Sequence, residues 1–450
     1  MKIRRYHPIL LALLVWCSGN YLLAQQPLDL KTAMKYAVEN HANIQKAKLD
    51  IDKGQQMVRE ALSPGLPQVN ANAQILNNLA LRTSLVPAEF FGGSPGEFQQ
   101  VQFGTNWNGS AGIQLNQLVF DQTYFLGLKA TRAVTDFYKI MLEKNKEDVI
   151  YEVAKIYYQI QLSRTNRGIL NANLDQIEGL LTVTTKQYDN GFAKKIDVDR
   201  LRVQQSNLET QIKNLDLQIG QAEQALKFAM NMPLETDILL TDTITEATSS
   251  AVDFATIQPS YEQKPDLLAL RKQQELYGYD ERRWKAGFYP SVALFANYTY
   301  EWQANNFGDI TNGDLWFDYS QIGLSFNIPI FDGFYKSSKI QTARLNAMQT
   351  LSDYRLALLG MQLKHVTAVS TMQVYQNNLR SVEETRKVAE EVYRVAQSRF
   401  REGLAPITEL LDAETSMRES QTNYITTLAQ IKLAEIDLLN ANGLLIKMIE

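Results

Sequence analysis

The stretch FREGLAPITELLDAE, residues 400–414, joins two unusually long segments of helical pattern and decides the architecture of this chain. Gly403 supplies the left-handed conformation that commonly ends a helix, and a new apolar repeat begins after it. Apolar side chains then recur every seven residues, at Leu410, Met417, Tyr424, Ile431 and Leu438. Such a seam predicts a helix that packs against neighbouring helices by knobs into holes.

The same pattern occurs earlier in the chain. The stretch YDNGFAKKIDVDRLR, residues 188–202, also turns at a glycine, and the two turn glycines lie 212 positions apart. With this shift Val198 falls on Leu410, and apolar positions match along the following helix. The equivalent segments 120–231 and 331–443 therefore predict an internal duplication of one long helical hairpin. No proline lies between Pro95 and Pro233 or between Pro329 and Pro406, as uninterrupted helices require.

Four short segments alternate between apolar and polar side chains, which is typical of strands with one face on lipid or core and the other on water. They cover residues 69–75, 109–118, 292–302 and 321–328. We expect the first two and the last two to pair, and residues 80–107, rich in Gly, Pro, Phe and Asn, to form a loop.

Aromatic side chains cluster in the second strand pair, at Tyr298, Tyr300, Trp302, Trp316 and Tyr319. This clustering is typical of an aromatic girdle at a membrane interface. A soluble sheet with a packed aromatic face is the alternative, but four alternating strands beside two long hairpins favour a membrane. Because four strands cannot close a barrel, we expect copies of the chain to complete a closed oligomer.

Residues 1–24 predict an export signal, with a basic start, an apolar core over residues 9–16 and a small residue at Ala24. Cys17, the only cysteine, lies in this segment, so the mature chain would have no thiol and no disulfide. A lipid anchor on Cys17 would want a small residue before it, where Trp16 stands, and its lipidation stays open. No later segment has the apolar run of a spanning helix, so we expect any membrane crossing to be made by strands.

Composition and motifs argue against several function classes. The formal net charge is −4 and no basic cluster occurs, so we expect no nucleic-acid partner. The three histidines, His7, His41 and His365, have no metal-ligand spacing, and no nucleophile elbow, phosphate loop or zinc-protease helix is present. We therefore expect no catalytic, cofactor or metal site and no enzyme activity.

The two turns in their duplicated helical setting resemble the TolC family of outer-membrane efflux proteins, over essentially the whole mature chain. The order of signal, short helices, strand pair, long hairpin and connector carries the resemblance, while no single short motif is specific. It implies a mainly α fold with a membrane β-barrel portion. In a homotrimer, each chain would give four strands to a twelve-stranded barrel, and the long helices would form a coiled-coil barrel through the periplasm.

Four parts of the chain are expected on this basis. They are a signal peptide (1–24), a first repeat (25–231), an equatorial connector (232–264) and a second repeat with a C-terminal tail (265–450). Within the repeats we expect strands over about 68–80, 108–119, 291–303 and 318–330, and long hairpins over about 122–231 and 334–443.

The family resemblance implies a passive exit duct of a tripartite efflux or type I secretion system. Its partners would be a periplasmic membrane-fusion adaptor, an inner-membrane transporter of the RND or ABC type, and outer-membrane lipid. Which pump and adaptor it serves, and whether its substrate is a drug, a metal ion or a protein, stays open. A non-conducting periplasmic coiled-coil protein is the alternative, but it would not account for the paired strands.

Glu409 and Asp412 lie three residues apart just after the second turn, so they share a helix face. Three copies around an axis would gather six carboxylates, which repel one another and attract cations. The resemblance assigns acids at these positions to a ring at the periplasmic gate. A solvated helix start, where acids complement the helix dipole, is the alternative.

Other site residues rest on the same resemblance. Asp197, in the first turn, matches a family acid that helps to latch the closed state. The family's latch partners are a tyrosine and an arginine, where this chain has Phe400 and Ala405, so closure by helix packing is the alternative to a charged latch. The turn tips match the adaptor-docking surface, with chain reversal as their other role: Gly191, Phe192, Ala193, Gly403, Leu404 and Ala405.

Overall fold

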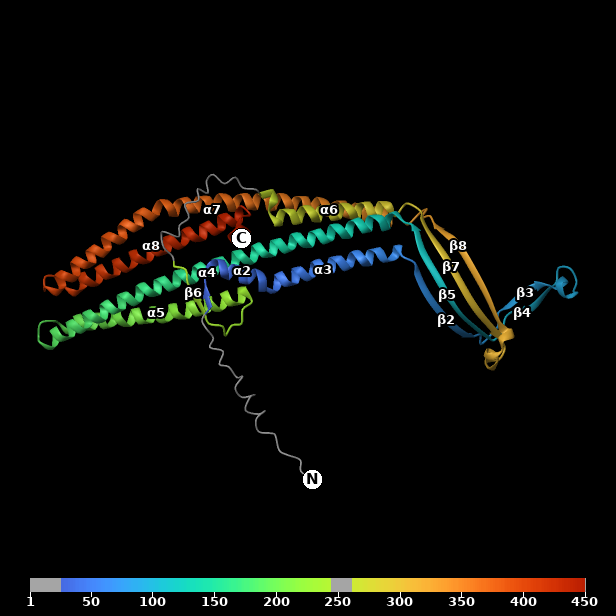
Figure 1. Ribbon diagram of the computed structural model, residues 1–450, viewed down its shortest axis with the longest axis horizontal. Helices are drawn as coiled ribbons and strands as arrows, with labels where there is room; N and C mark the ends of the chain where they lie inside the picture. The colour runs from blue at the N-terminus through green and yellow to red at the C-terminus, as the bar shows by residue number, and fades with distance from the viewer. Residues whose placement is uncertain (1–25, 244–260, 450) are drawn as a thin grey trace, which may run out of the picture. The chain divides into compact units, whose positions relative to one another are not determined.

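The computed structural model describes residues 26–243 and 261–449 (Figure 1). The predicted signal and residues 244–260 of the predicted connector lie outside the described residues. The chain is mainly helical with some strands. The helices are α2 (Leu30–Asn40), α3 (Ala42–Leu62), α4 (Gln122–Asp189), α5 (Lys195–Met230), α6 (Pro265–Ala286), α7 (Tyr335–Arg401) and α8 (Ile407–Ala441). The strands are β1 (Gln26–Leu28), β2 (Gln68–Asn77), β3 (Thr83–Pro87), β4 (Phe98–Gln102), β5 (Trp107–Phe120), β6 (Ile238–Leu240), β7 (Ser291–Ala304) and β8 (Trp316–Asn327).

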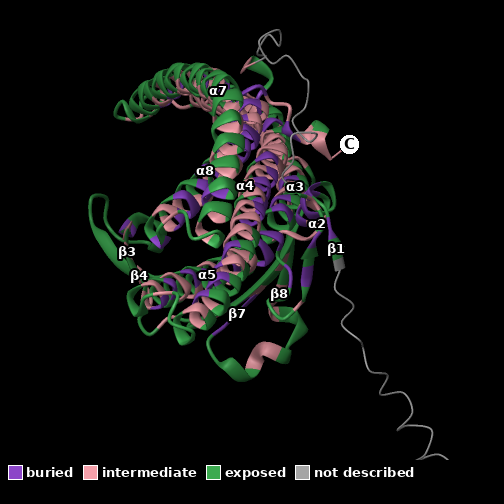
Figure 2. Cartoon of the chain, turned by 90° about the vertical axis from the view of Figure 1, so that its left-hand side faces the viewer, coloured by how far each residue is buried: buried purple, intermediate pink, exposed green. Residues whose placement is uncertain are grey.

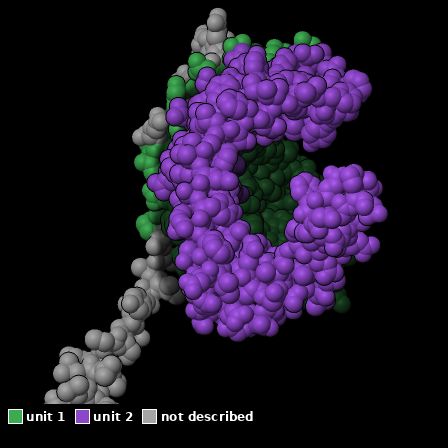
Figure 3. Space-filling view, turned by 90° about the vertical axis from the view of Figure 1, so that its right-hand side faces the viewer, with its two compact units in different colours: residues 1–49, 139–269, 354–450 green, residues 50–138, 270–353 purple. Residues whose placement is uncertain are grey.

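The chain divides into two compact units, which are coloured separately in Figure 3. The first comprises residues 1–49, 139–269 and 354–450, and the second comprises residues 50–138 and 270–353. The division falls within α3, α4, α6 and α7, so each of these helices contributes residues to both units.

The second unit is built on a four-stranded antiparallel sheet in the order β2-β5-β7-β8. The predicted pairing within each half is confirmed, since Ala71 lies opposite Ile113 and Ala296 lies opposite Ile322. The pairing of β5 with β7, which places Ile113 opposite Tyr298, joins the two halves into one sheet. The unit curves into an open arc around a hollow (Figure 3).

The strand register sorts the side chains of this sheet onto two faces. The apolar face includes Val69, Ala71, Ile113, Leu115, Leu294, Tyr298, Ile322 and Leu324. The opposite face includes Asn70, Asn72, Gln114, Asn116, Asn297, Thr299 and Gln321. Ile322 is 77% exposed on the apolar face. A sheet with one exposed apolar face and one amide-rich face suits a boundary between lipid and water.

Residues 80–107, predicted as a loop, contain an antiparallel hairpin of β3 and β4. Leu85 lies opposite Gln100, and the turn Ala88–Phe91 is followed by Gly92 with a φ of +81°. The loop prediction was wrong for these strands because five residues give too short an alternation to stand out among glycine and proline.

Trp302, predicted as part of an aromatic girdle, is fully buried. Its indole Nε1 donates a hydrogen bond to the Asp309 carbonyl oxygen at 3.2 Å, and the Trp316 Nε1 donates to the Ile310 carbonyl oxygen at 2.8 Å. The Tyr300 and Trp316 rings stack with their centroids 5.1 Å apart. These tryptophans therefore fasten the connection between β7 and β8 onto the sheet, and Trp302 does not face lipid.

One core of the first unit lies where α2, α4 and α5 meet the short parallel strands β1 and β6. The Tyr157 hydroxyl lies 3.0 Å from both the Leu28 carbonyl oxygen and the Asp242 carboxylate. The same carboxylate accepts a hydrogen bond from the Leu30 N–H at 2.9 Å. Burial and the Asp242 charge raise the pKa of Tyr157, so it stays protonated and ties the chain before α2 to α4.

The helices α4 and α5, and likewise α7 and α8, form long hairpins whose turn ends belong to the first unit (Figure 1). Buried positions follow α4 and α8, whereas much of α7 stays exposed (Figure 2). Leu410, Met417, Ile431 and Leu438 of the predicted seam are buried, and Tyr424 is partly buried. The structure thus confirms the predicted apolar seam along α8.

Candidate functional site

Both helical turns have the same backbone geometry. In the second turn, the Gly403 N–H donates to the Phe400 carbonyl oxygen at 3.0 Å and the Leu404 N–H donates to the Arg399 carbonyl oxygen at 2.8 Å. The first turn makes the matching bonds, and its glycine has a φ of +82° against +75° in the second. This arrangement is a Schellman motif, in which a left-handed residue lets two N–H groups reach back to the last helical turn.

Beneath the turns lies one apolar cluster to which all four long helices contribute. Its buried members are Ile177, Leu180, Leu201, Leu208, Tyr393, Ala396, Ile407, Leu410, Ala413 and Met417. Phe400, the expected latch residue, is half-buried and packs against this cluster. A fully buried leucine contributes roughly 1.5–3 kcal/mol, so apolar packing is the main attraction between the two turn ends.

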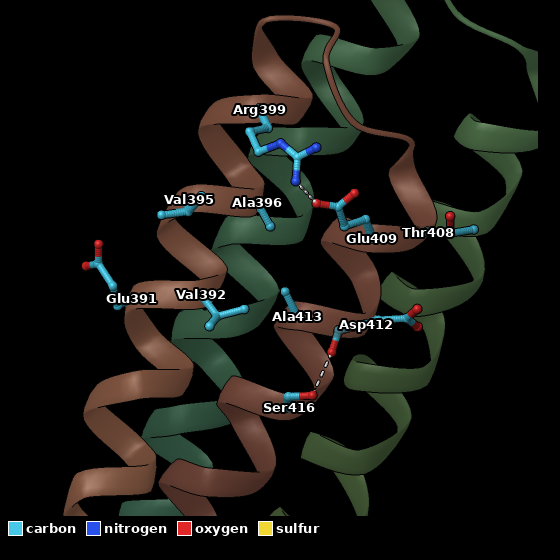
Figure 4. Close-up of a pocket in the computed structure, with 10 residues that line it drawn as sticks. All are labelled: Glu391, Val392, Val395, Ala396, Arg399, Thr408, Glu409, Asp412, Ala413 and Ser416. Atoms are coloured by element: carbon cyan, nitrogen blue, oxygen red, sulfur yellow. Dashed lines mark hydrogen bonds and ion pairs between the residues drawn. The ribbon is translucent and has the colours of Figure 1, made fainter.

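Glu409 and Asp412 line an open pocket of about 660 Å³ between α7 and α8 (Figure 4). Glu409 forms an ion pair with Arg399, whose Nη1 lies 2.5 Å from the Glu409 Oε1, and this pair ties the end of α7 to the start of α8. The Asp412 carboxylate extends away from Arg399 (Figure 4). The two acids therefore share a pocket, but their carboxylates point in different directions.

Glu414, two residues after Asp412 on α8, is fully buried. Its Oε2 accepts a hydrogen bond from the Gln204 Nε2 of α5 at 3.0 Å, and its Oε1 lies 3.5 Å from the Arg418 Nε. Burial raises the pKa of Glu414, while Arg418 and the Gln204 hydrogen bond oppose the shift. Burial and the Glu414 charge raise the pKa of Tyr393 on α7 to about 12. Polar side chains of three helices thus meet at Glu414.

Asp197 lies in the first turn of α5, where its Oδ2 accepts a hydrogen bond from the Lys194 N–H at 3.4 Å. This contact stays within one turn of chain, and an acid there also complements the helix dipole. Of the expected docking tips, Phe192 and Leu404 are 85% and 66% exposed, both turn glycines are exposed, and Ala193 and Ala405 are half-buried.

Two residues of this site, Arg399 and Glu414, were missed from the sequence. Arg399 could have been found, because it is a basic residue in the last turn of one helix, ten positions before an acid in the first turn of the next. Glu414 gave no such signal, because its burial depends on the approach of Gln204 from a distant part of the chain.

The two described histidines have local roles. The His41 Nδ1 accepts a hydrogen bond from the Asn43 N–H at 3.1 Å, and the His365 ring packs edge-on against Tyr261. Among residues 26–243 and 261–449, no group of three or more His, Cys, Asp or Glu side chains could hold a metal ion. Within the same residues, no helix combines the length and the apolar character needed to cross a membrane.

A sequence model described as outer membrane efflux protein matches residues 33–232 and 256–444. The chain belongs to the outer membrane efflux protein family. The resemblance seen in the two turns is thereby confirmed, and the chain is an outer-membrane protein that extends into the periplasm. Members of this family are passive channels and not enzymes.

Individual relatives align over nearly the whole length of this chain. The outer membrane protein TolC of Salmonella enteritidis is 23% identical over 471 residues, covering 100% of this chain and 90% of that protein. TolC of Escherichia coli strain K12 is 24% identical over 464 residues, covering 98% and 89%. The CmeC outer membrane channel of Campylobacter jejuni has a TM-score of 0.75 at 15% identity, covering 92% of this chain and 85% of that one. VceC of Vibrio cholerae has a TM-score of 0.70 at 17% identity, covering 92% and 96%, so these structures share the fold.

Proposed function

We propose that this chain is the exit duct of a tripartite efflux or type I secretion system and conducts substrates passively across the outer membrane and through the periplasm. The match of the outer membrane efflux protein family over most of the chain carries the proposal. The curved, two-faced sheet and the long helical hairpins are suited to the membrane part and the periplasmic part of such a duct.

Three copies of the chain would complete the strand barrel and the helical barrel of the duct. Each chain would give β2, β5, β7 and β8 to a twelve-stranded barrel, with the apolar face on lipid and the amide-rich face on water. Leu356 and Leu363 on α7 are 70% and 67% exposed, which supports packing of this helix against a neighbouring copy. The similar lengths of α4 and α7, 68 and 67 residues, support an origin by internal duplication.

The periplasmic gate would lie at the second turn, with Glu409 and Asp412 in its acidic ring. Their position on an open pocket at the turn end supports this role. Closure would rest on the apolar cluster against which Phe400 packs, and on the Gln204–Glu414 hydrogen bond between the two hairpins. Asp197 is retained as a latch candidate, although its described hydrogen bond lies within its own turn.

The exposed turn tips would dock a periplasmic membrane-fusion adaptor, which an inner-membrane transporter of the RND or ABC type would engage. The exposure of Phe192 and Leu404 supports this surface. Residues 232–264 and the C-terminal tail would surround the middle of the helical barrel.

Fractionation and conductance of the wild-type protein test the proposed function. We expect the exported protein in the outer-membrane fraction, chemical cross-linking to trimers, and discrete single-channel currents from purified trimers in planar bilayers. Heat-dissociated protein is the control and should give no current. A protein that stays soluble and carries no current would instead be a non-conducting coiled-coil spacer.

A further inference from the structure

The Arg399–Glu409 ion pair changes the charge that the second turn presents. Arg399 lies in the last turn of α7 and Glu409 in the first turn of α8, and the two side chains point toward each other (Figure 4). The side chains are 49% and 40% exposed, so water screens the pair and it contributes little to stability. The main consequence of this close pair is therefore electrostatic.

The other charges on the pocket wall can be assigned in the same way. Glu391 pairs with Arg394 on the same helix, and their charged atoms lie 2.5 Å apart. Thr408 and Ser416 are neutral. Among the described residues, Asp412 is then the carboxylate of this wall that has no ion-pair partner.

The first turn does not carry an equivalent pair. At the shift of 212 positions, Gln187 stands in place of Arg399, Asp197 in place of Glu409 and Arg200 in place of Asp412. Asp197 accepts a hydrogen bond from the Lys194 N–H instead. The ion pair between a basic residue at the end of one helix and an acid at the start of the next is thus found in the second hairpin and not in the first.

We propose that Arg399 is a specificity-determining residue of the channel entrance, which neutralises Glu409 so that Asp412 sets the preference for cations. The inference rests on the proposed function, because it requires the second turn to line the conducting path. Each chain then presents one net negative charge at these positions instead of two, and a trimer presents three instead of six. Cationic solutes are favoured over anions, but less strongly than by six unpaired carboxylates.

Reversal potentials across a potassium chloride gradient test the assignment. Arg399→Gln leaves two negative charges per chain, and the cation-to-anion permeability ratio should rise about threefold, because a unit charge several ångströms away in water shifts an ion's energy by about RT. Glu409→Gln leaves Arg399 unpaired, and the ratio should fall toward one. The double variant R399Q/E409Q restores one net negative charge and should return to within about twofold of wild type.

The double variant R401Q/E409Q is the matched control, because Arg401 is exposed and lies two positions from Arg399. It removes one positive and one negative charge, as R399Q/E409Q does, but it keeps Arg399. The cation-to-anion permeability ratio should therefore stay as low as in Glu409→Gln. The assignment would be overturned if R401Q/E409Q restored the permeability ratio as fully as R399Q/E409Q, or if Arg399→Gln kept the wild-type ratio. In either case the conducting wild type would still uphold the proposed function. Wild-type trimers without current would overturn the proposed function and this inference together.

Discussion

The two helical turns share one backbone and differ in their charges. Each ends a helix of 68 or 67 residues with a left-handed glycine, and each begins a helix of 36 or 35 residues. In the first turn, Asp197 caps its own helix. In the second turn, Glu409 pairs with Arg399 across the turn, and Glu414 is buried against Gln204 of the other hairpin. Glycine placement and apolar spacing produce the same backbone twice, while a few polar residues give the second turn its own chemistry.

This difference is consistent with the proposed gate at the second turn. The contact of Asp197 stays within one turn, so it is unaffected when a helix shifts as a rigid body. The contacts of Glu409 and Glu414 join different helices, so displacement of α8 from α7 or α5 breaks them. Interhelix contacts with two alternative arrangements are what a gate requires.

The largest expected effect tests whether the two turns are packed equally. Leu410 is fully buried in the cluster, and its equivalent Val198 is 4% exposed. Leu410→Ala should lower the free energy of unfolding by about 2–5 kcal/mol, because it leaves a cavity among four helices. Val198→Ala removes fewer atoms and should cost roughly half as much. Unfolding of the trimer followed by helical circular dichroism measures both, and a larger loss in Val198→Ala would contradict the packing described.

A smaller effect tests whether the two backbones are equivalent. Gly191 and Gly403 have positive φ, and nothing lies within 4 Å of an added Cβ at either position. Gly191→Ala and Gly403→Ala should therefore each cost about 1–2 kcal/mol through backbone strain alone. Gly168 in the interior of α4 is also open but has no positive φ, so Gly168→Ala should stabilise by about 0.5–1 kcal/mol. Clearly unequal costs at the two turns would show that their backbones differ.

The smallest expected effect is on the pH dependence of stability, which should differ between the buried Glu414 and an acid on the surface. Burial raises the pKa of Glu414, so the folded chain holds this proton more tightly than the unfolded chain. Its contribution to stability is full below its ordinary pKa of 4.5 and is lost as the pH rises through the raised value. We therefore expect Glu414→Gln to gain stability relative to wild type as the pH rises from about 5 to 8.

The control for this pH series is Glu383→Gln. Glu383 pairs with Lys387, and the hydrogen bond from Lys387 lowers the pKa of Glu383. Its contribution is present above its ordinary pKa and is lost only as the pH falls through the lowered value, so the difference from wild type should stay constant over the same range. Thermal unfolding midpoints measured at each pH would contradict the assignment if the Glu414→Gln difference were equally constant.

Local signals in the sequence predicted the long helices, their turns and the alternating strands. Gly403 and the seven-residue spacing after it act on neighbouring residues, so they can be recognised without the fold. The burial of Trp302 could not be predicted in this way, because it depends on Gly109 across the β5–β7 pairing. Glu409 was named from its spacing, but its pairing with Arg399 depends on how closely α8 returns beside α7.

The most direct test of the gate compares matched double variants of the two turns in single-channel recordings. The second-turn variant is Glu409→Ala/Asp412→Ala, and the first-turn variant is Asp189→Ala/Arg200→Ala, which removes two exposed charges beside the first turn and leaves the latch candidate Asp197 in place. The gate at the second turn predicts that the first of these raises the conductance or loses cation preference, while the other keeps wild-type currents. A second-turn variant identical to wild type, or a change confined to the first-turn variant, would contradict it.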